Sequence, residues 1–288
     1  MFEVPYAGLV RIRLDLAYDG THFRGWARQP GLRTVQGTLE DAIARILGGE
    51  PRLVVAGRTD AGVHATGQVA HLDLSPEQVE ALISRGSKAS DPVAGMAARL
   101  RGVLGAYPDV TVSRTAVALP GFDARFSAVW RRYEYRLADR QTRDDPLQRH
   151  RTTAVRSQLD VGAMHRAAGT LTGLHDFATF CKPRPGATTI RTLLEYSWQR
   201  QPDGVITATV ASDAFCHSMV RALVGACVAV GAGRLAEHDL VTLRDARQRV
   251  PEVKVLAARG LTLTEVGYSA DQDLAERAAQ TRARRDAF

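Results

Sequence analysis

Long hydrophobic runs are missing from this sequence. None approaches 18 consecutive apolar residues, so we expect no membrane span. Residues 1–5 lack a basic stretch before an apolar core, so we expect no signal peptide. Cysteine is scarce: Cys181, Cys216 and Cys227 are odd in number, and no two have C-x-x-C spacing. This usage favours a reduced, cytoplasmic protein.

Net negative charge is also absent. The chain carries 38 Lys and Arg residues against 31 Asp and Glu, a formal charge of +7, and nearly all the cations are Arg. Arg binds phosphate through two parallel hydrogen bonds and stacks on bases. The excess of cationic residues therefore favours a nucleic-acid partner. An Arg-rich genome produces the same excess, and composition alone leaves both explanations open. The 45% hydrophobic content is ordinary for a globular protein.

Period-two and helical patterns alternate in the same order in both halves of the chain. In the first half, apolar alternation predicts strands at 11–18, 52–56, 68–74 and 109–117, and helical spacing predicts helices at 38–47, from 75 and at 93–105. In the second half, the corresponding strands are 132–137, 189–199, 205–211 and 261–268, and the helices are 160–171, 215–230 and 239–249.

This order predicts two βαββαβ halves. Each is ferredoxin-like or RRM-like, with antiparallel strand pairs, so the predicted class is α+β. We expect an N-terminal half over residues 1–118 and a C-terminal half over 119–270. Residues 271–288 are expected to form a charged tail, either a helix or a frayed end.

The most informative stretch runs from Ala56 to His71 and is punctuated by glycines between two predicted strands. It places one cation, Arg58, two residues before one carboxylate, Asp60. A neighbouring Arg keeps an Asp ionised at neutral pH, which suits a nucleophile better than a general acid. An Asp before a glycine also commonly bonds its own backbone to make a turn, and residue type alone does not exclude that role.

The ungapped run Gly57 to His64, followed by Gly67 to His71, closely resembles the signature of the tRNA pseudouridine synthase A family. In that family the Asp of this loop is the catalytic nucleophile, which implies that role for Asp60. The fold implied is two related α/β halves whose sheets join, with the catalytic cleft between them.

Other segments carry the same resemblance. They are Tyr18 to Gly20 with Phe23 to Trp26, Thr34 to Gln36, Phe122 to Ala128 with Arg131 to Tyr135, and Ala214–Phe215 with Met219 to Gly225. The resemblance implies that Tyr133 packs on the target base and that Arg221 pairs with the catalytic Asp. With Arg58, these residues are our candidates for substrate binding.

The implied activity is isomerisation of uridine to pseudouridine at positions 38 to 40 of the tRNA anticodon stem-loop, by a homodimer. This reaction changes no redox state, so we expect neither cofactor nor metal. The sequence leaves open whether Asp60 attacks C1′ of the sugar or C6 of the base, or assists elimination. Residues 84–109 and 250–260 depart from the family pattern, which bears on peripheral tRNA contacts.

Two residues have alternative roles, and the whole chain has two alternative functions. Tyr133 is also typical of sheet packing, and Arg221 on an apolar helix could extend to solvent. The chain could be a non-catalytic RNA-binding protein on twin RRM-like sheets, although the aromatic RNP pattern is missing. A metal-dependent hydrolase using His64, His71 and Asp73 is a third hypothesis, but the spacing matches no compact zinc pattern.

Overall fold

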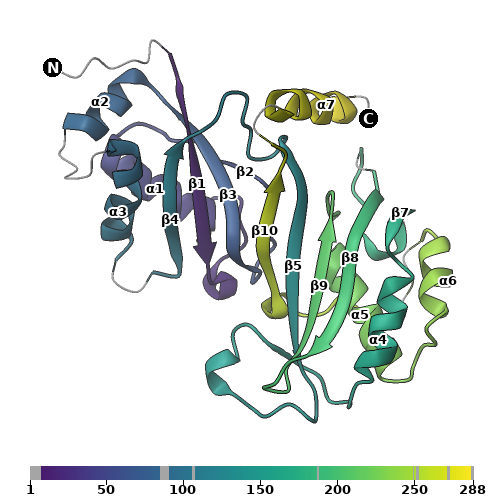
Figure 1. The fold of residues 1–288 in the computed structure, drawn as a ribbon. Helices are drawn as coiled ribbons and strands as arrows, with labels where there is room; N and C mark the ends of the chain where they lie inside the picture. The colour runs from purple at the N-terminus through teal and green to yellow at the C-terminus, as the bar shows by residue number, and fades with distance from the viewer. Residues whose placement is uncertain are drawn as a thin grey trace. The chain divides into compact units, whose positions relative to one another are not determined.

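The computed structural model describes residues 8–84, 91–105, 108–186, 188–248, 250, 253–270 and 273–286. It is a mixed α+β fold whose strands are mostly antiparallel, as the sequence predicted (Figure 1). Contacts divide the chain into two units, residues 1–128 with 266–287 and residues 129–265. The predicted division into residues 1–118, 119–270 and 271–288 remains our proposal for the domains.

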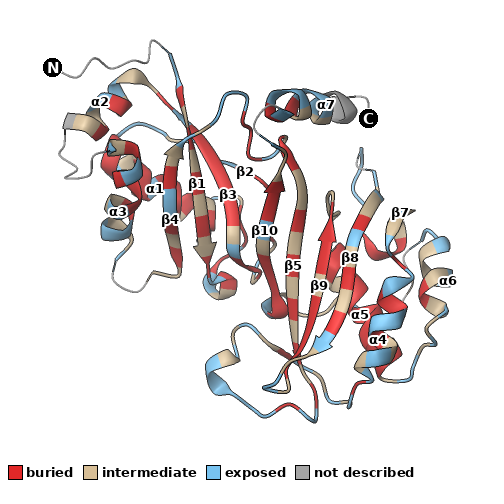
Figure 2. Cartoon of the chain, viewed as in Figure 1, coloured by how far each residue is buried: buried red, intermediate tan, exposed pale blue. Residues whose placement is uncertain are grey.

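In the first unit, β1 (Val10–Tyr18) lies between β4 (Val110–Val117) and β3 (His64–Leu74) and is antiparallel to both. The short β2 (Val54–Val55) pairs with β3. The predicted alternation of β1 is confirmed, because every second side chain is buried. Figure 2 shows these alternating buried positions along β1.

Three helices complete the body of this unit: α1 (Val35–Leu47), α2 (Pro76–Ser84) and α3 (Pro92–Leu104). Thr34 caps α1 by accepting from the Gly37 N–H, so this helix begins earlier than the apolar spacing predicted. The helix predicted from residue 75 is α2, and it begins with a capping box, in which the side chains of Ser75 and Gln78 each accept from the other's backbone N–H. Part of the divergent 84–109 segment, residues 85–90 and 106–107, lies outside the described residues.

In the second unit, strand order from β10 is β5, β9, β8 and β7. The bounds are β5 (Ala128–Ala138), β7 (Gly173–Asp176), β8 (Ile190–Arg200), β9 (Ile206–Ser212) and β10 (Leu261–Tyr268), with the short β6 (Thr153–Ala154) parallel to β5. Helices α4 (Val161–Gly169), α5 (Met219–Gly231) and α6 (Asp239–Asp245) accompany them. Neither β6 nor β7 was predicted.

The chain returns to the first unit through the end of β10, and α7 (Leu274–Asp286) contacts the 121–127 segment there. Arg282 donates to Asp123 at 2.6 Å, and its guanidinium lies over the Phe126 ring. The Ser127 hydroxyl donates to the Leu274 carbonyl at 3.0 Å. Of the two expectations for residues 271–288, a helix or a frayed end, the helix is observed over residues 274–286.

Candidate active site

Asp60 lies in the tight connection between β2 and β3. Its side chain is half-buried, whereas Arg58 is exposed. The Asp60 carbonyl accepts from the Val63 N–H at 3.2 Å, which closes a turn. Gly62 has a φ of +77°, a conformation that side-chain-bearing residues rarely adopt, so the glycine allows the chain to turn directly after Asp60.

The N-terminal motif packs against this loop, which explains why the two sequence motifs occur together. The Trp26 N–H donates to the Thr59 carbonyl at 3.0 Å. A Cβ on Gly20 would lie 2.1 Å from the Val63 carbonyl oxygen, so only glycine allows the backbones to approach this closely. The Gly20 N–H also donates to His64 Nδ1 at 3.0 Å.

In the second unit, Tyr133 is on β5, paired with Val210 of β9. It is buried, and its ring meets the Phe215 ring edge-on, with centroids 5.1 Å apart. Phe215 belongs to the motif before α5, so this contact joins two of the motifs that carry the family resemblance. Packing within the sheet and the predicted role at the target base are both compatible with this position.

Arg221 is the half-buried cation in the first turns of α5, a helix whose other side chains are buried. Its Nε donates to the Leu256 carbonyl at 2.6 Å, and the Leu256 N–H donates to the Arg221 carbonyl at 3.2 Å. Tyr135 donates to the next carbonyl, Ala257, at 2.7 Å. The segment after α6 therefore holds the Arg221 stem, a contact that no pattern in the sequence predicts.

Arg58 and Asp60 are two residues apart in one loop of the first unit, and Tyr133 and Arg221 both lie in the second unit, on β5 and α5. The pairing of Arg221 with Asp60 stays a prediction. So do the catalytic role of Asp60 and the substrate-binding roles of the other three residues.

No cluster of three or more His, Cys, Asp or Glu side chains that could hold a metal ion occurs within the described part of the chain. The three residues of the metal hypothesis have other partners. His64 Nδ1 accepts from Gly20, His71 Nδ1 accepts from the Ala124 N–H at 3.0 Å, and Asp73 forms an ion pair with Arg11. Burial, reinforced by Arg11, lowers the pKa of His71 to about 4.

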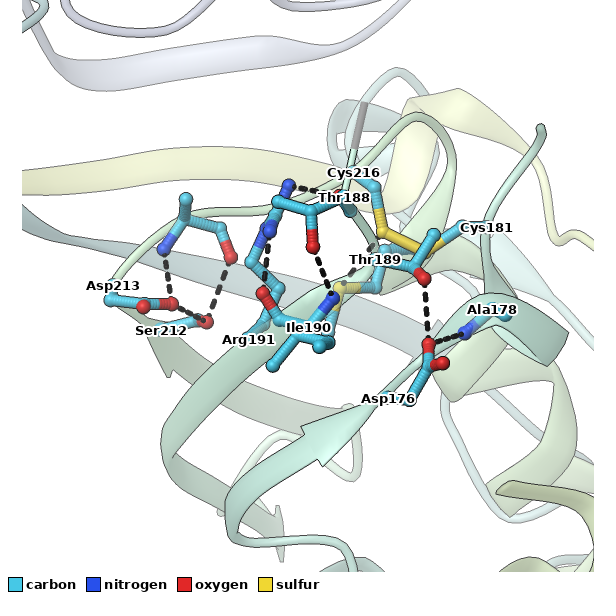
Figure 3. Close-up of a disulfide and its surroundings, with 12 residues drawn as sticks. Asp176, Ala178, Cys181, Thr188, Thr189, Ile190, Arg191, Ser212, Asp213 and Cys216 are labelled. Atoms are coloured by element: carbon cyan, nitrogen blue, oxygen red, sulfur yellow. Dashed lines mark hydrogen bonds between the residues drawn. A yellow bond between two sulfur atoms is a disulfide. The ribbon is translucent and has the colours of Figure 1, made fainter. Parts of the chain in front are cut away.

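The cysteine prediction is wrong for two of the three residues. A disulfide joins Cys181, at the end of the short 3₁₀ helix 178–180, to Cys216, beside Phe215 (Figure 3). Their Cα atoms are 5.7 Å apart, and the Lys182 N–H donates to the His217 carbonyl at 2.9 Å alongside the bridge. The fold thus joins residues that are 35 positions apart in sequence, which spacing rules do not detect. Cys227 is free and buried.

Comparisons with known proteins agree with this arrangement. The family model described as tRNA pseudouridine synthase matches residues 16–104 and 167–269, which include Asp60 and Arg221. The chain belongs to this family. A tRNA pseudouridine synthase A from Leifsonia xyli subsp. xyli is 64% identical over 277 residues, covering 94% of this chain and 96% of that protein.

Two further relatives are also named tRNA pseudouridine synthase A. The one from Frankia casuarinae is 54% identical over 277 residues and that from Corynebacterium glutamicum 46% over 284, each match covering 96% of both chains. No helix in the described part of the chain is long and apolar enough to cross a membrane.

Proposed function

We propose that this protein is an isomerase that converts uridine to pseudouridine in tRNA, at positions 38 to 40 of the anticodon stem-loop. The observation that carries the proposal is the Asp60 loop, which occurs with its full signature in a chain that belongs to the tRNA pseudouridine synthase family. The names of the relatives support the reaction and the substrate.

The proposed reaction breaks the N1–C1′ glycosidic bond, turns the uracil and joins C5 to C1′. The hydrogen on C5 is released to solvent, and N1 ends with a proton. Asp60 supplies the nucleophile, and Arg221 keeps it ionised and oriented. The reaction neither oxidises nor reduces the uridine, so the proposal includes no cofactor and no metal.

The other two candidates act on the RNA. A uridine in a stem has to be flipped out, which costs a few kcal/mol, and stacking on one aromatic ring returns about 1–3 kcal/mol. Tyr133 supplies that ring in the proposal. Arg58, which is exposed, supplies a guanidinium for phosphate or base contacts.

Release of tritium from tRNA labelled with 5-³H-uridine tests the proposal, because the reaction expels the C5 hydrogen. The assay is run without added metal and with EDTA. We expect release by the wild type and a loss of more than about 10⁴-fold in Asp60→Asn, since removing a nucleophile abolishes the covalent step. Asp41→Asn, at an exposed position on α1, is the control and should keep activity.

Each result has a definite meaning. Normal turnover by Asp60→Asn would remove the nucleophile assignment while leaving the enzyme activity. Salt-sensitive tRNA binding with no tritium release by the wild type would favour the second candidate, a non-catalytic RNA-binding protein. Activity that EDTA abolishes would contradict the metal-free proposal.

We further propose a cytoplasmic homodimer. Leu174 of β7 and Ile190 and Leu194 of β8 are more than half exposed, and exposed apolar clusters of this kind favour association. Light scattering should give twice the chain mass of 31.3 kDa. Ile190→Glu should shift the mass towards the monomer, whereas Leu147→Glu, at an exposed apolar position elsewhere, should not. A monomeric wild type would contradict this proposal.

A further inference from the structure

Three buried polar side chains lie directly behind the Asp60 loop and are joined in one hydrogen-bond network. The Tyr18 hydroxyl, at the end of β1, is 2.8 Å from Thr59 Oγ1. Gln68 of β3 donates through Nε2 to the Tyr18 hydroxyl at 3.1 Å and to the Gly57 carbonyl at 2.9 Å. Their exposed fractions are 5%, 7% and 0% for Tyr18, Thr59 and Gln68.

The pairing of β1 with β3 creates this network. Leu16 pairs with Gln68, and after a change of register Tyr18 pairs with Ala65, so the tyrosine ring reaches back towards the loop that precedes β3. Figure 1 shows the two strands side by side. The Tyr18 ring also packs against Trp26, with centroids 6.1 Å apart.

The directions of the two hydrogen bonds that Gln68 donates are fixed by the groups involved. Gln68 Oε1 accepts from the Val69 N–H at 3.2 Å, so its NH₂ group faces Tyr18 and Gly57. Since the Tyr18 oxygen accepts from Gln68, its own hydrogen is available for Thr59. Burial raises the pKa of Tyr18 to about 12, so this hydroxyl keeps its hydrogen throughout the physiological range.

The network holds the backbone on both sides of Arg58. Gln68 holds the Gly57 carbonyl, Tyr18 holds the Thr59 side chain, and the Trp26 N–H holds the Thr59 carbonyl. Asp60 follows directly, so its Cα position is set by the segment 57–59, which has three separate attachments. In a buried network each missing partner leaves another polar group unsatisfied, which makes the arrangement rigid.

We propose that Tyr18, Gln68 and Thr59 are positioning residues that fix Asp60 and Arg58 for the isomerisation. None of the three needs to touch the RNA. This inference rests on the proposed function. Its physical basis is that a nucleophile displaced by about 1 Å can lose about 100-fold in rate.

Thr59→Val tests the proposal, because valine keeps the shape of threonine and removes the hydroxyl. We expect single-turnover tritium release to slow about 10- to 100-fold, while tRNA affinity stays within about twofold. Thr59→Ser restores the hydroxyl and should recover the rate to within about threefold of the wild type. Tyr18→Phe should give the same split between rate and affinity.

Thr115→Val is the matched control. Thr115 is also a buried threonine of the first unit, and its hydroxyl donates to the Val93 carbonyl on α3, away from the Asp60 loop. We expect this variant to lose stability as Thr59→Val does and to keep the wild-type rate. Equal rates in Thr59→Val and wild type, or equal rate losses in Thr59→Val and Thr115→Val, would overturn the proposal.

Hydrogen exchange separates failure of this proposal from failure of the function. Amides of residues 57–63 should exchange faster in Thr59→Val and at the wild-type rate in Thr115→Val. If the wild type releases no tritium, the proposed function fails, and the positioning role in that reaction fails with it. If the wild type is active but exchange at 57–63 is unchanged in Thr59→Val, the positioning proposal alone fails.

Discussion

The two units hold their candidate residues in different ways. Asp60 is on a loop, and the hydrogen bonds of Tyr18, Gln68 and Trp26 fix the residues that precede it. Tyr133 is on a central strand, where its ring packs against Phe215, and Arg221 is on an apolar helix, where hydrogen bonds with Leu256 also hold it. Substitutions behind the loop should therefore change rate more than stability, whereas substitutions around the strand and helix should change both.

The disulfide gives the largest expected effect on stability and would sharpen this contrast. It closes a loop of 35 residues in the second unit, and chain-entropy arguments give about 3–4 kcal/mol for a loop of that size. Cys181→Ser should lower the free energy of unfolding by up to that amount, measured by denaturant titration. Cys227→Ser, at the free cysteine, is the comparison variant, because it makes the same Cys-to-Ser change without breaking the disulfide.

A thiol count checks the premise of that prediction. Unfolded protein should react with one equivalent of thiol reagent before reduction and three after it. Three reactive thiols in unreduced protein would show that the pair is not oxidised, and the stability difference should then vanish.

Arg221→Met should lower the rate of tritium release by about 100-fold, because an ionic hydrogen bond to the nucleophile would be lost. Methionine keeps much of the unbranched stem, but loss of the Leu256 contact should also cost about 1 kcal/mol of stability. Arg234→Met, at an exposed position beyond α5, should change neither. An active Arg221→Met with reduced stability would make Arg221 a purely structural residue.

Tyr133→Leu should reduce kcat/KM for tRNA by about tenfold, the value of one lost stacking contact. Tyr133→Phe keeps the ring and its edge contact with Phe215, so it should bind tRNA normally. It should react slowly only if the hydroxyl takes part beyond stacking. Normal kcat/KM in Tyr133→Leu, measured on folded protein, would assign this residue to sheet packing alone.

The last expected effect is a pH dependence of the first unit. His71 is neutral when folded, with its pKa lowered to about 4, and gains a proton more readily when unfolded, near 6.5. Between these two pKa values a proton binds the unfolded chain more tightly. The free energy of unfolding should therefore decrease as the pH is lowered, by at most about 1.4 kcal/mol per pH unit. His71→Gln keeps an acceptor for the Ala124 N–H and should flatten this window.

Carboxylates act in a different window. The hydrogen bond from Arg11 lowers the pKa of Asp73 below its ordinary value of 3.8. The ion pair therefore stabilises the fold fully above pH 3.8, and this stabilisation is lost only as the pH falls below that value. An unfolding midpoint that falls equally between pH 6.5 and 4 in wild type and His71→Gln would contradict the assignment to His71.

Periodicity predicted the order of the main elements and the α+β class, because burial of one face imposes periods of 2 and 3.6 on any such sequence. It failed where tertiary contacts decide. The predicted helix from Phe215 begins instead at Met219, because Ser218 has a φ of +66° and breaks the helical path. The edge strand β7 has only four residues, too few for a period to show.

The candidate site was predictable only in part. Asp60 and its motif could be identified because the chemistry is concentrated in one ungapped run. The supporting residues Tyr18 and Gln68 are 50 positions apart and become neighbours only when β1 pairs with β3. Their signal was present, since each falls within a stretch that resembles the family, but sequence alone gives such residues no partner.

The return of the chain to its first unit has a consequence for synthesis. The 121–127 segment is held by residues translated much later, through bonds from Tyr268 and Arg282 and to the Leu274 carbonyl. On the ribosome, residues 129–265 therefore emerge while the first unit still lacks α7. The second unit can complete its contacts first, and the first unit completes its own contacts only after α7 has emerged.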